Sequence, residues 1–143
     1  MEEKLIQEKF MKGYDCSQVV LTHFAEQLGL TEEMANKVSA CFGGGMMQAD
    51  TCGAFTGALM AVGLKYGHFN EETLLAEKDV MMAKTAEFKQ KFFEKFESSN
   101  CKELLGYDVS IPEEFQEALS SGRMLSFCPT VVNAAIKALE EVL

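Results

Sequence analysis

Five cysteines are the residues of this chain whose chemistry is most specific: Cys16, Cys41, Cys52, Cys101 and Cys128. A deprotonated thiol attacks disulfides and binds metals, so the state of each thiol decides what it can do. No pair of cysteines has the CxxC spacing typical of thioredoxin-like motifs and zinc knuckles. Any chemistry of these thiols therefore depends on a fold that brings distant segments together.

Four of the cysteines share a predicted position at the cap or in the first turn of a helix: Cys16, Cys52, Cys101 and Cys128. Unpaired backbone N–H groups and the positive end of the helix dipole stabilise a thiolate there. Such thiols have pKa values of roughly 3.5–7.5, against about 8.5 for a free thiol. Cys41 is predicted at the end of a helix and is interpreted as an incidental core residue.

The elements that position these thiols are predicted to be helices, because apolar residues recur with helical spacing and no segment alternates with strand spacing. We expect an all-α, single-domain irregular bundle of about six to eight helices over residues 1–143. Helices are predicted over 3–11, 16–28, from 31 to the triple glycine, 52–66, 70–97, 101–105, from 112 to before 122, and from 128 onward.

Two groups of glycines lie near the cysteines. Gly53 and Gly57 recur with helical spacing and predict a central helix that another helix crosses closely. Gly43, Gly44 and Gly45 form either a nest of backbone N–H groups that holds an anion or a tight turn. Both groups are candidate cofactor-binding residues, and the triple glycine is a candidate wall of the site.

Charge and hydropathy exclude several classes of partner. The chain has 22 acidic and 13 basic residues, a net charge of −9, which disfavours nucleic acid and anionic lipid. The most apolar run, residues 52–64, is too short to cross a bilayer, which needs about 20 residues. The N-terminus lacks the apolar segment of a secretory signal, so we expect a cytoplasmic protein with reduced thiols.

Arg123 is the only arginine and precedes Cys128 by five residues. A guanidinium there could stabilise a thiolate or hold an anionic substrate. The alternative is a solvated charge near a helix end.

The order of the motifs resembles a known family. Cys16, then Cys52-Gly53-Ala54 with Gly57 three residues on, then Cys101 and Cys128, is similar to the C_GCAxxG_C_C pattern. The resemblance covers nearly the whole chain and includes the segments Gly43-Gly44-Gly45-Met46 and 101–106. It implies a small helical protein with thiol redox activity, and it gives Cys41 no role.

Three functions remain open from the sequence. In the first, a thiol redox protein uses Cys52 as the preferred nucleophile, with Cys16, Cys101 and Cys128 resolving or tuning, a thiol or disulfide partner and no required cofactor. In the second, the same four cysteines bind zinc, iron or an iron–sulfur cluster. In the third, the cysteines are inert core residues of a helical interaction domain.

Overall fold

All of the regular structure in this protein is helical, so the predicted all-α class is confirmed. The computed structural model describes all 143 residues. Its eight α-helices are α1 (Glu3–Met11), α2 (Cys16–Phe24), α3 (Glu32–Ser39), α4 (Gly53–Tyr66), α5 (Leu74–Phe93), α6 (Cys101–Leu105), α7 (Pro112–Ser120) and α8 (Arg123–Val142). Short irregular helical turns occur at Ala40–Phe42, Gly45–Ala49 and Glu71–Thr73.

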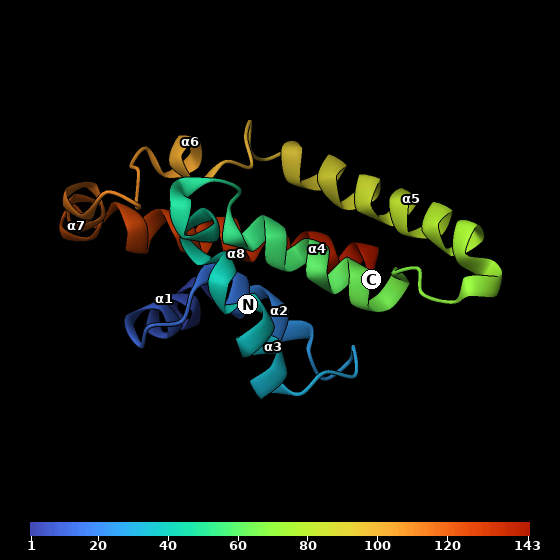
Figure 1. The fold of residues 1–143 in the computed structure, drawn as a ribbon. Helices are drawn as coiled ribbons and strands as arrows, with labels where there is room; N and C mark the ends of the chain where they lie inside the picture. Colours follow the sequence, from blue (N-terminus) through green and yellow to red (C-terminus); the bar gives the residue numbers. More distant parts are fainter.

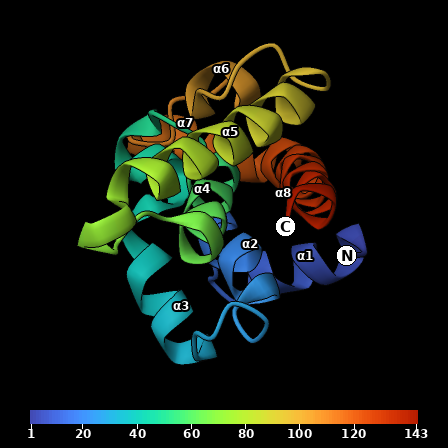
Figure 2. The same ribbon diagram turned by 90° about the vertical axis from the view of Figure 1, so that its right-hand side faces the viewer.

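Helices α4 and α8 run through the middle of the bundle (Figure 1). Helix α5 covers one side of them, and α1, α2 and α3 lie on the opposite side, as the turned view also shows (Figure 2). The short helices α6 and α7 lie at the end of the bundle where α8 begins. The central position predicted for the glycine-bearing helix is confirmed, because α4 contacts α2, α5 and α8.

A cluster of 22 buried residues forms the core between these helices. Its aromatic part lies between α4 and α5, where the Phe55 ring centroid is 5.1 Å from that of Phe92 and 5.7 Å from that of Phe88. Phe88 and Phe92 are fully buried, as the helical spacing of phenylalanines on α5 predicted. This packing anchors α5 against the central pair of helices.

Where α2 crosses α4, the two backbones approach so closely that positions 53 and 57 of α4 have room only for glycine. A Cβ atom on Gly57 would lie 2.8 Å from the Ser17 carbonyl oxygen, and one on Gly53 would lie 2.5 Å from Cys16 Sγ. Ser17 is fully buried, and its hydroxyl donates to the Ser39 carbonyl at 2.8 Å. The close crossing predicted from the glycine spacing is therefore confirmed, and α2 is the crossing helix.

Helix α8 begins earlier than predicted. It starts at Arg123 after Gly122, whose φ of 81° is the left-handed conformation that glycine tolerates, so Pro129 lies inside the helix. Proline has no N–H to donate to the Leu125 carbonyl four residues before it. Gln7 Nε2 of α1 donates to that carbonyl instead, at 2.8 Å. The prediction that Cys128 opens the last helix is thus wrong.

Two other helices end earlier than their sequence patterns predicted. Helix α2 ends at Phe24 and not at residue 28, and α5 ends at Phe93 and not near residue 97. In α2 the following turn brings the Leu30 N–H to the Ala25 carbonyl at 2.9 Å, which directs the chain into α3. The residues that these two helices lose, 25–28 and 94–97, include no cysteine.

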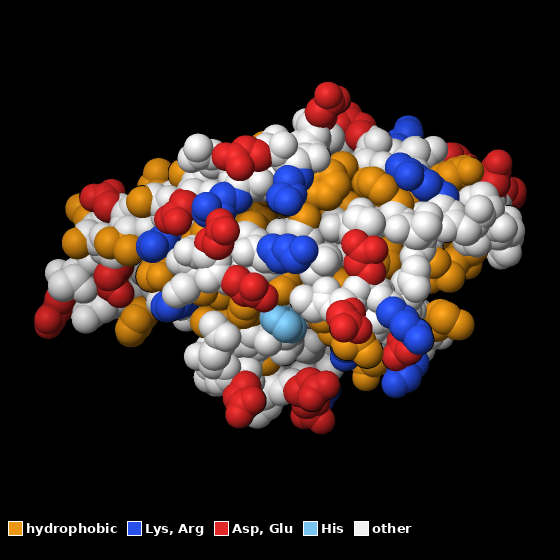
Figure 3. Space-filling model, turned by 180° about the vertical axis from the view of Figure 1, so that it is seen from behind, with side chains coloured by type: hydrophobic (Ala, Val, Ile, Leu, Met, Phe, Trp, Pro, Cys, Tyr) orange, Lys and Arg blue, Asp and Glu red, His pale blue; other side chains and the backbone are white.

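The surface mixes charges of both signs. On the face opposite to that of Figure 1, acidic and basic side chains alternate with apolar ones and form no single patch (Figure 3). None of the helices combines the length and the apolar character needed to span a bilayer.

Candidate functional site

A pocket of about 450 Å³ lies at the end of the bundle where α6 and α7 meet the central helices. Four cysteines line it: Cys16, Cys52, Cys101 and Cys128. The fold thus brings together thiols from four separate segments of the chain. Cys41 does not line this pocket and is exposed in the turn after α3, so the interpretation of Cys41 as a core residue is wrong.

The rest of the pocket wall is apolar. Of the 20 lining residues, 17 are hydrophobic, and they come from α1, α6, α7 and α8 as well as from the cysteine-bearing segments. Phe10, Leu104, Phe115, Leu119 and Phe127 are among them. Asp15 is the only charged residue in the lining.

Cys16 is the first residue of α2, directly after the N-cap residue Asp15. Gln18 supports this helix start, because its side-chain oxygen accepts from the Asp15 N–H at 2.9 Å. A hydrogen bond from the Cys52 thiol lowers the pKa of Cys16, and N–H groups of Gly44 and Ser17 lower it further against the effect of burial. Cys16 is partly exposed. Cys16 is therefore a partly accessible thiol whose thiolate form is favoured by the neighbouring hydrogen-bond donors.

Cys52 is the N-cap residue of α4 and is buried, with 9% of its surface exposed. Its backbone N–H donates to the Ser99 carbonyl at 2.7 Å. The hydrogen bond with Cys16 and burial hold the pKa of the Cys52 thiol well above its usual value. The pKa values of the two neighbouring thiols are thus shifted in opposite directions, downward for Cys16 and upward for Cys52.

Cys101 and Cys128 are neutral thiols. Burial, followed by the negative charge of Cys16, raises the pKa of Cys101 to about 11 and that of Cys128 to about 12. Of the four thiols predicted to have lowered pKa values at helix starts, only Cys16 has one, and the largest cause is the Cys52 side chain. Cys128 lies in the second turn of α8, and at Cys52 and Cys101 burial and neighbouring thiols outweigh the helix start.

The segment 43–50 packs beside these thiols, and Gly44 is its one residue in the pocket lining. A Cβ atom on Gly43 would lie 2.3 Å from Asp15 Cγ, and one on Gly45 would lie 2.8 Å from Cys101 Cβ. The Asp50 carbonyl accepts from the Cys101 N–H at 2.6 Å. The glycines let the backbone approach Cys16 and Cys101 at once, and this tight turn also presents the Gly44 N–H to Cys16.

The same segment is held in an unusual backbone conformation. Gly44 and Gly45 have positive φ angles, and so do Met46, Met47 and Ala49, at 61°, 59° and 56°. Left-handed conformations cost residues other than glycine roughly 1–2 kcal/mol each. Such strain persists only where surrounding structure holds the backbone in place, and here the Asp50 N–H closes the segment by donating to the Gly45 carbonyl at 2.9 Å. No pattern in the sequence predicted these positive φ angles at the methionines.

Arg123 has a structural role beside the pocket. Its Nε donates to the Leu105 carbonyl at 3.2 Å and its Nη2 to the Leu104 carbonyl at 3.1 Å, which satisfies the end of α6. The guanidinium lies 4.0 Å from the Phe127 ring centroid. Its charge lowers the pKa of Cys128 only slightly against burial. Arg123 does not line the pocket, so it is not placed to hold an anionic substrate there.

The alternative of a metal centre at Cys16, Cys52, Cys101 and Cys128 gains no support from the geometry. No group of three or more cysteine, histidine, aspartate or glutamate side chains is arranged so that it could hold a metal ion.

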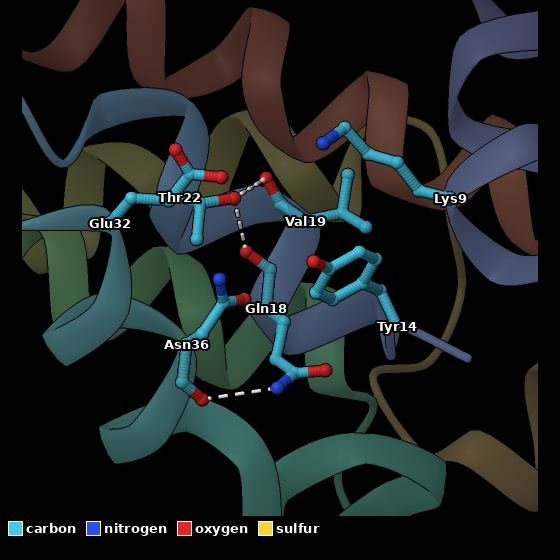
Figure 4. Close-up of a pocket in the computed structure, with 7 residues that line it drawn as sticks. All are labelled: Lys9, Tyr14, Gln18, Val19, Thr22, Glu32 and Asn36. Carbon is cyan, nitrogen blue, oxygen red and sulfur yellow. Dashed lines mark hydrogen bonds between the residues drawn. The ribbon is translucent and has the colours of Figure 1, made fainter. Parts of the chain in front are cut away.

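A second hollow, between α2 and α3, is not a binding site (Figure 4). It leaves no space for a water-sized molecule, and it has no cysteine in its wall. The groups around it bond one another: Gln18 Nε2 donates to the Asn36 carbonyl at 3.1 Å, and the Thr22 hydroxyl to the Gln18 carbonyl at 2.7 Å. It is a well-packed contact between polar side chains of α2 and its neighbouring helices.

The family described as "Putative redox-active protein (C_GCAxxG_C_C)" matches residues 14–142, and the chain belongs to that family. The resemblance seen in the sequence is thereby confirmed, and the matched range contains all four cysteines of the pocket. None of the curated proteins and none of the solved structures compared matches the chain.

Proposed function

We propose that this member of a redox-active family is a thiol–disulfide oxidoreductase in which Cys16 is the nucleophile and Cys52 the resolving thiol. The observation that carries the proposal is that Cys16 and Cys52 line the same pocket, with Cys16 Sγ only 2.5 Å from where a Cβ atom on Gly53, the residue after Cys52, would lie. The pKa values of the two thiols are shifted in opposite directions. A reactive dithiol needs one thiolate that attacks and one thiol that stays protonated until the second step.

Cys16 takes the role that the sequence pattern had suggested for Cys52. Cys16 is partly exposed and has the lowered pKa, whereas Cys52 is buried and has the raised one. An attacking sulfur needs access to its target as well as negative charge. Both requirements are met at Cys16.

In the first step the Cys16 thiolate attacks one sulfur of a substrate disulfide. A Cys16–substrate disulfide forms, the substrate S–S bond breaks, and the leaving thiolate takes up a proton. Cys16 then no longer carries the charge or accepts the hydrogen bond that raised the pKa of Cys52. The Cys52 thiol loses its proton more easily at that stage, which prepares it for the second attack.

In the second step Cys52 sulfur attacks Cys16 Sγ, and the second substrate thiolate leaves and is protonated. The net reaction converts the protein dithiol and one substrate disulfide into a protein disulfide and two substrate thiols. Two electrons pass from the protein to the substrate, and the reverse reaction oxidises thiols. Cys101 and Cys128, which are neutral, tune the pair by keeping this side of the pocket uncharged.

Mass spectrometry of protein oxidised with a small disulfide reagent tests the proposal. In a Cys41→Ala background, which removes the exposed thiol, the chain should lose two hydrogens and yield a Cys16–Cys52 linked peptide. The Cys52→Ser variant should stop at the mixed disulfide on Cys16, and Cys16→Ser should form neither product. A disulfide that joins Cys101 to Cys128 in the Cys16→Ser variant at the original rate would contradict the assignment.

A further inference from the structure

The pocket that contains the thiol pair also restricts which substrates can reach it. We infer that the substrate is a small, uncharged, apolar disulfide, an inference that rests on the proposed function of Cys16 and Cys52. The volume of about 450 Å³ falls in the range of roughly 300–1,000 Å³ that is typical of small-molecule sites.

The lining provides no positively charged side chain that could pair with an anion. It contains no lysine, arginine or histidine, and its one charged side chain is the carboxylate of Asp15. Arg123, the nearest guanidinium on α8, is already bound to two carbonyls and lies over the Phe127 ring. A carboxylate that entered the pocket would lose its water without a partner and would face two negative groups, Asp15 and Cys16. Anionic disulfides such as oxidised glutathione are therefore disfavoured.

The rim of the pocket favours apolar molecules. Met11 of α1 is 75% exposed and Phe115 of α7 is 41% exposed, and both line the pocket. These side chains extend apolar surface from the thiols out to solvent. Burial of an apolar substrate against them removes water from both surfaces, which favours binding. The substrate sulfur is then presented to Cys16 inside an apolar enclosure.

The experiment compares two aromatic disulfides of different charge. The Cys41→Ala protein reacts with neutral 4,4′-dithiodipyridine and with dianionic 5,5′-dithiobis(2-nitrobenzoate), and each rate constant is divided by that of a small reference thiol. This division removes the different intrinsic reactivity of the two reagents. We expect the normalised rate constant of the neutral disulfide to exceed that of the dianion by about tenfold or more, in the range that a selective pocket achieves.

A positive charge added at the rim provides the matched comparison. Phe115→Lys should reduce the preference for the neutral disulfide, because it places a cation beside the opening. Met11→Lys should act in the same direction and serves if Phe115→Lys fails to fold. Leu75→Lys, on the exposed face of α5 where 79% of the side chain is accessible, adds the same charge away from the pocket and should leave the preference unchanged.

The outcomes separate this inference from the proposed function. If oxidant produces the Cys16–Cys52 disulfide but both reagents react at equal normalised rates, the substrate class is wrong and the oxidoreductase stands. A preference for the dianion overturns the substrate class in the same way. If neither reagent reacts at Cys16 and oxidant forms no Cys16–Cys52 link, the proposed function itself is overturned.

Discussion

Cys16 and Cys101 face the same pocket from corresponding positions, since each is the first residue of its helix. The pKa of Cys16 is lowered and that of Cys101 is raised to about 11. Burial acts on both thiols in the same direction. The difference lies in the donors: Cys16 accepts hydrogen bonds from the Cys52 thiol and from backbone N–H groups. In this pocket a thiolate is stabilised by specific donors and not by a helix start alone.

The comparison extends to the two walls of the pocket. On the α2–α4 wall the backbone of the segment 43–50 is bent and held close to the thiols. On the α6–α8 wall the thiols lie among aliphatic and aromatic side chains, and Cys128 belongs to an interior helical turn. One wall is built to stabilise a charge, and the other to exclude water from it.

Removal of the Cys16 thiol should have the largest effect. In the Cys41→Ala background, Cys16→Ser should slow alkylation by iodoacetamide at pH 7.5 by on the order of 100-fold, because burial still raises the pKa of each remaining thiol and limits its access to the reagent. Cys128→Ser in the same background should change the rate by less than about twofold. Equal losses in the two variants would show that the walls do not differ in this way.

Gly53→Ala should disturb the α2–α4 wall of the pocket, because it places a side chain where the two helix backbones cross. The added Cβ atom would lie 2.5 Å from Cys16 Sγ and 2.9 Å from the Phe42 carbonyl oxygen, and neither neighbour is a flexible chain end. We expect a loss of about 1–3 kcal/mol in the free energy of unfolding, measured by urea denaturation. Gly63→Ala, on the same helix, meets no atom within 4 Å and should stabilise the protein by about 0.5–1 kcal/mol.

The buried Cys128 thiol on the α6–α8 wall should make the stability of the protein depend on alkaline pH. The pKa of Cys128 is about 12 in the folded chain, above its ordinary value of 9.0, so the unfolded chain releases this proton first. The stability that Cys128 contributes is therefore complete below pH 9 and is lost as the pH rises from about 9 towards 12, by up to about 1.4 kcal/mol per pH unit.

Chemical denaturation between about pH 8 and pH 11, a range that spans most of this titration, measures the loss. Cys128→Ala should give a shallower decline than the unchanged protein, and Leu75→Ala, which changes an exposed side chain without a titrating group, should not alter the decline. A decline of equal slope in all three proteins would remove Cys128 as its cause.

The smallest expected effect concerns the hydrogen bond from Gln7 of α1 to the backbone of α8, the helix that carries Cys128. Gln7→Leu leaves the Leu125 carbonyl without its donor and should cost about 1 kcal/mol. In a Pro129→Ala background the restored N–H can serve that carbonyl, so the same change at Gln7 should cost less. A double-mutant cycle in urea measures this coupling. Additive losses would mean that the proline and the glutamine are independent.

Some of this architecture could be predicted from local patterns. The bounds of α1 and α6 agree with the sequence, and α6 has a clear signal at its start, where the Asn100 side chain accepts from the Glu103 N–H at 3.0 Å. The close crossing at Gly53 and Gly57 could also be predicted, since small residues at helical spacing let a second helix approach the backbone directly. In these cases residues near in sequence determine the structure.

The features that the sequence did not reveal depend on distant partners. Pro129 was predicted in the first turn of a helix because the Gln7 donor that lets it lie inside α8 belongs to another helix. The distinct states of Cys16 and Cys52 follow from a hydrogen bond between residues of α2 and the start of α4. Spacing along the chain contains no information about which thiol donates and which accepts.

The contacts that join the segment before α4 to the start of α6 have a consequence for how the protein matures. Cys52 N–H bonds the Ser99 carbonyl, and Cys101 N–H bonds the Asp50 carbonyl, across an intervening stretch of about 50 residues whose closure is entropically costly. Contacts between segments so far apart in the chain form slowly. Until the chain has folded so that Cys52 and Gly44 lie beside Cys16, the Cys16 thiol lacks the neighbours that lower its pKa.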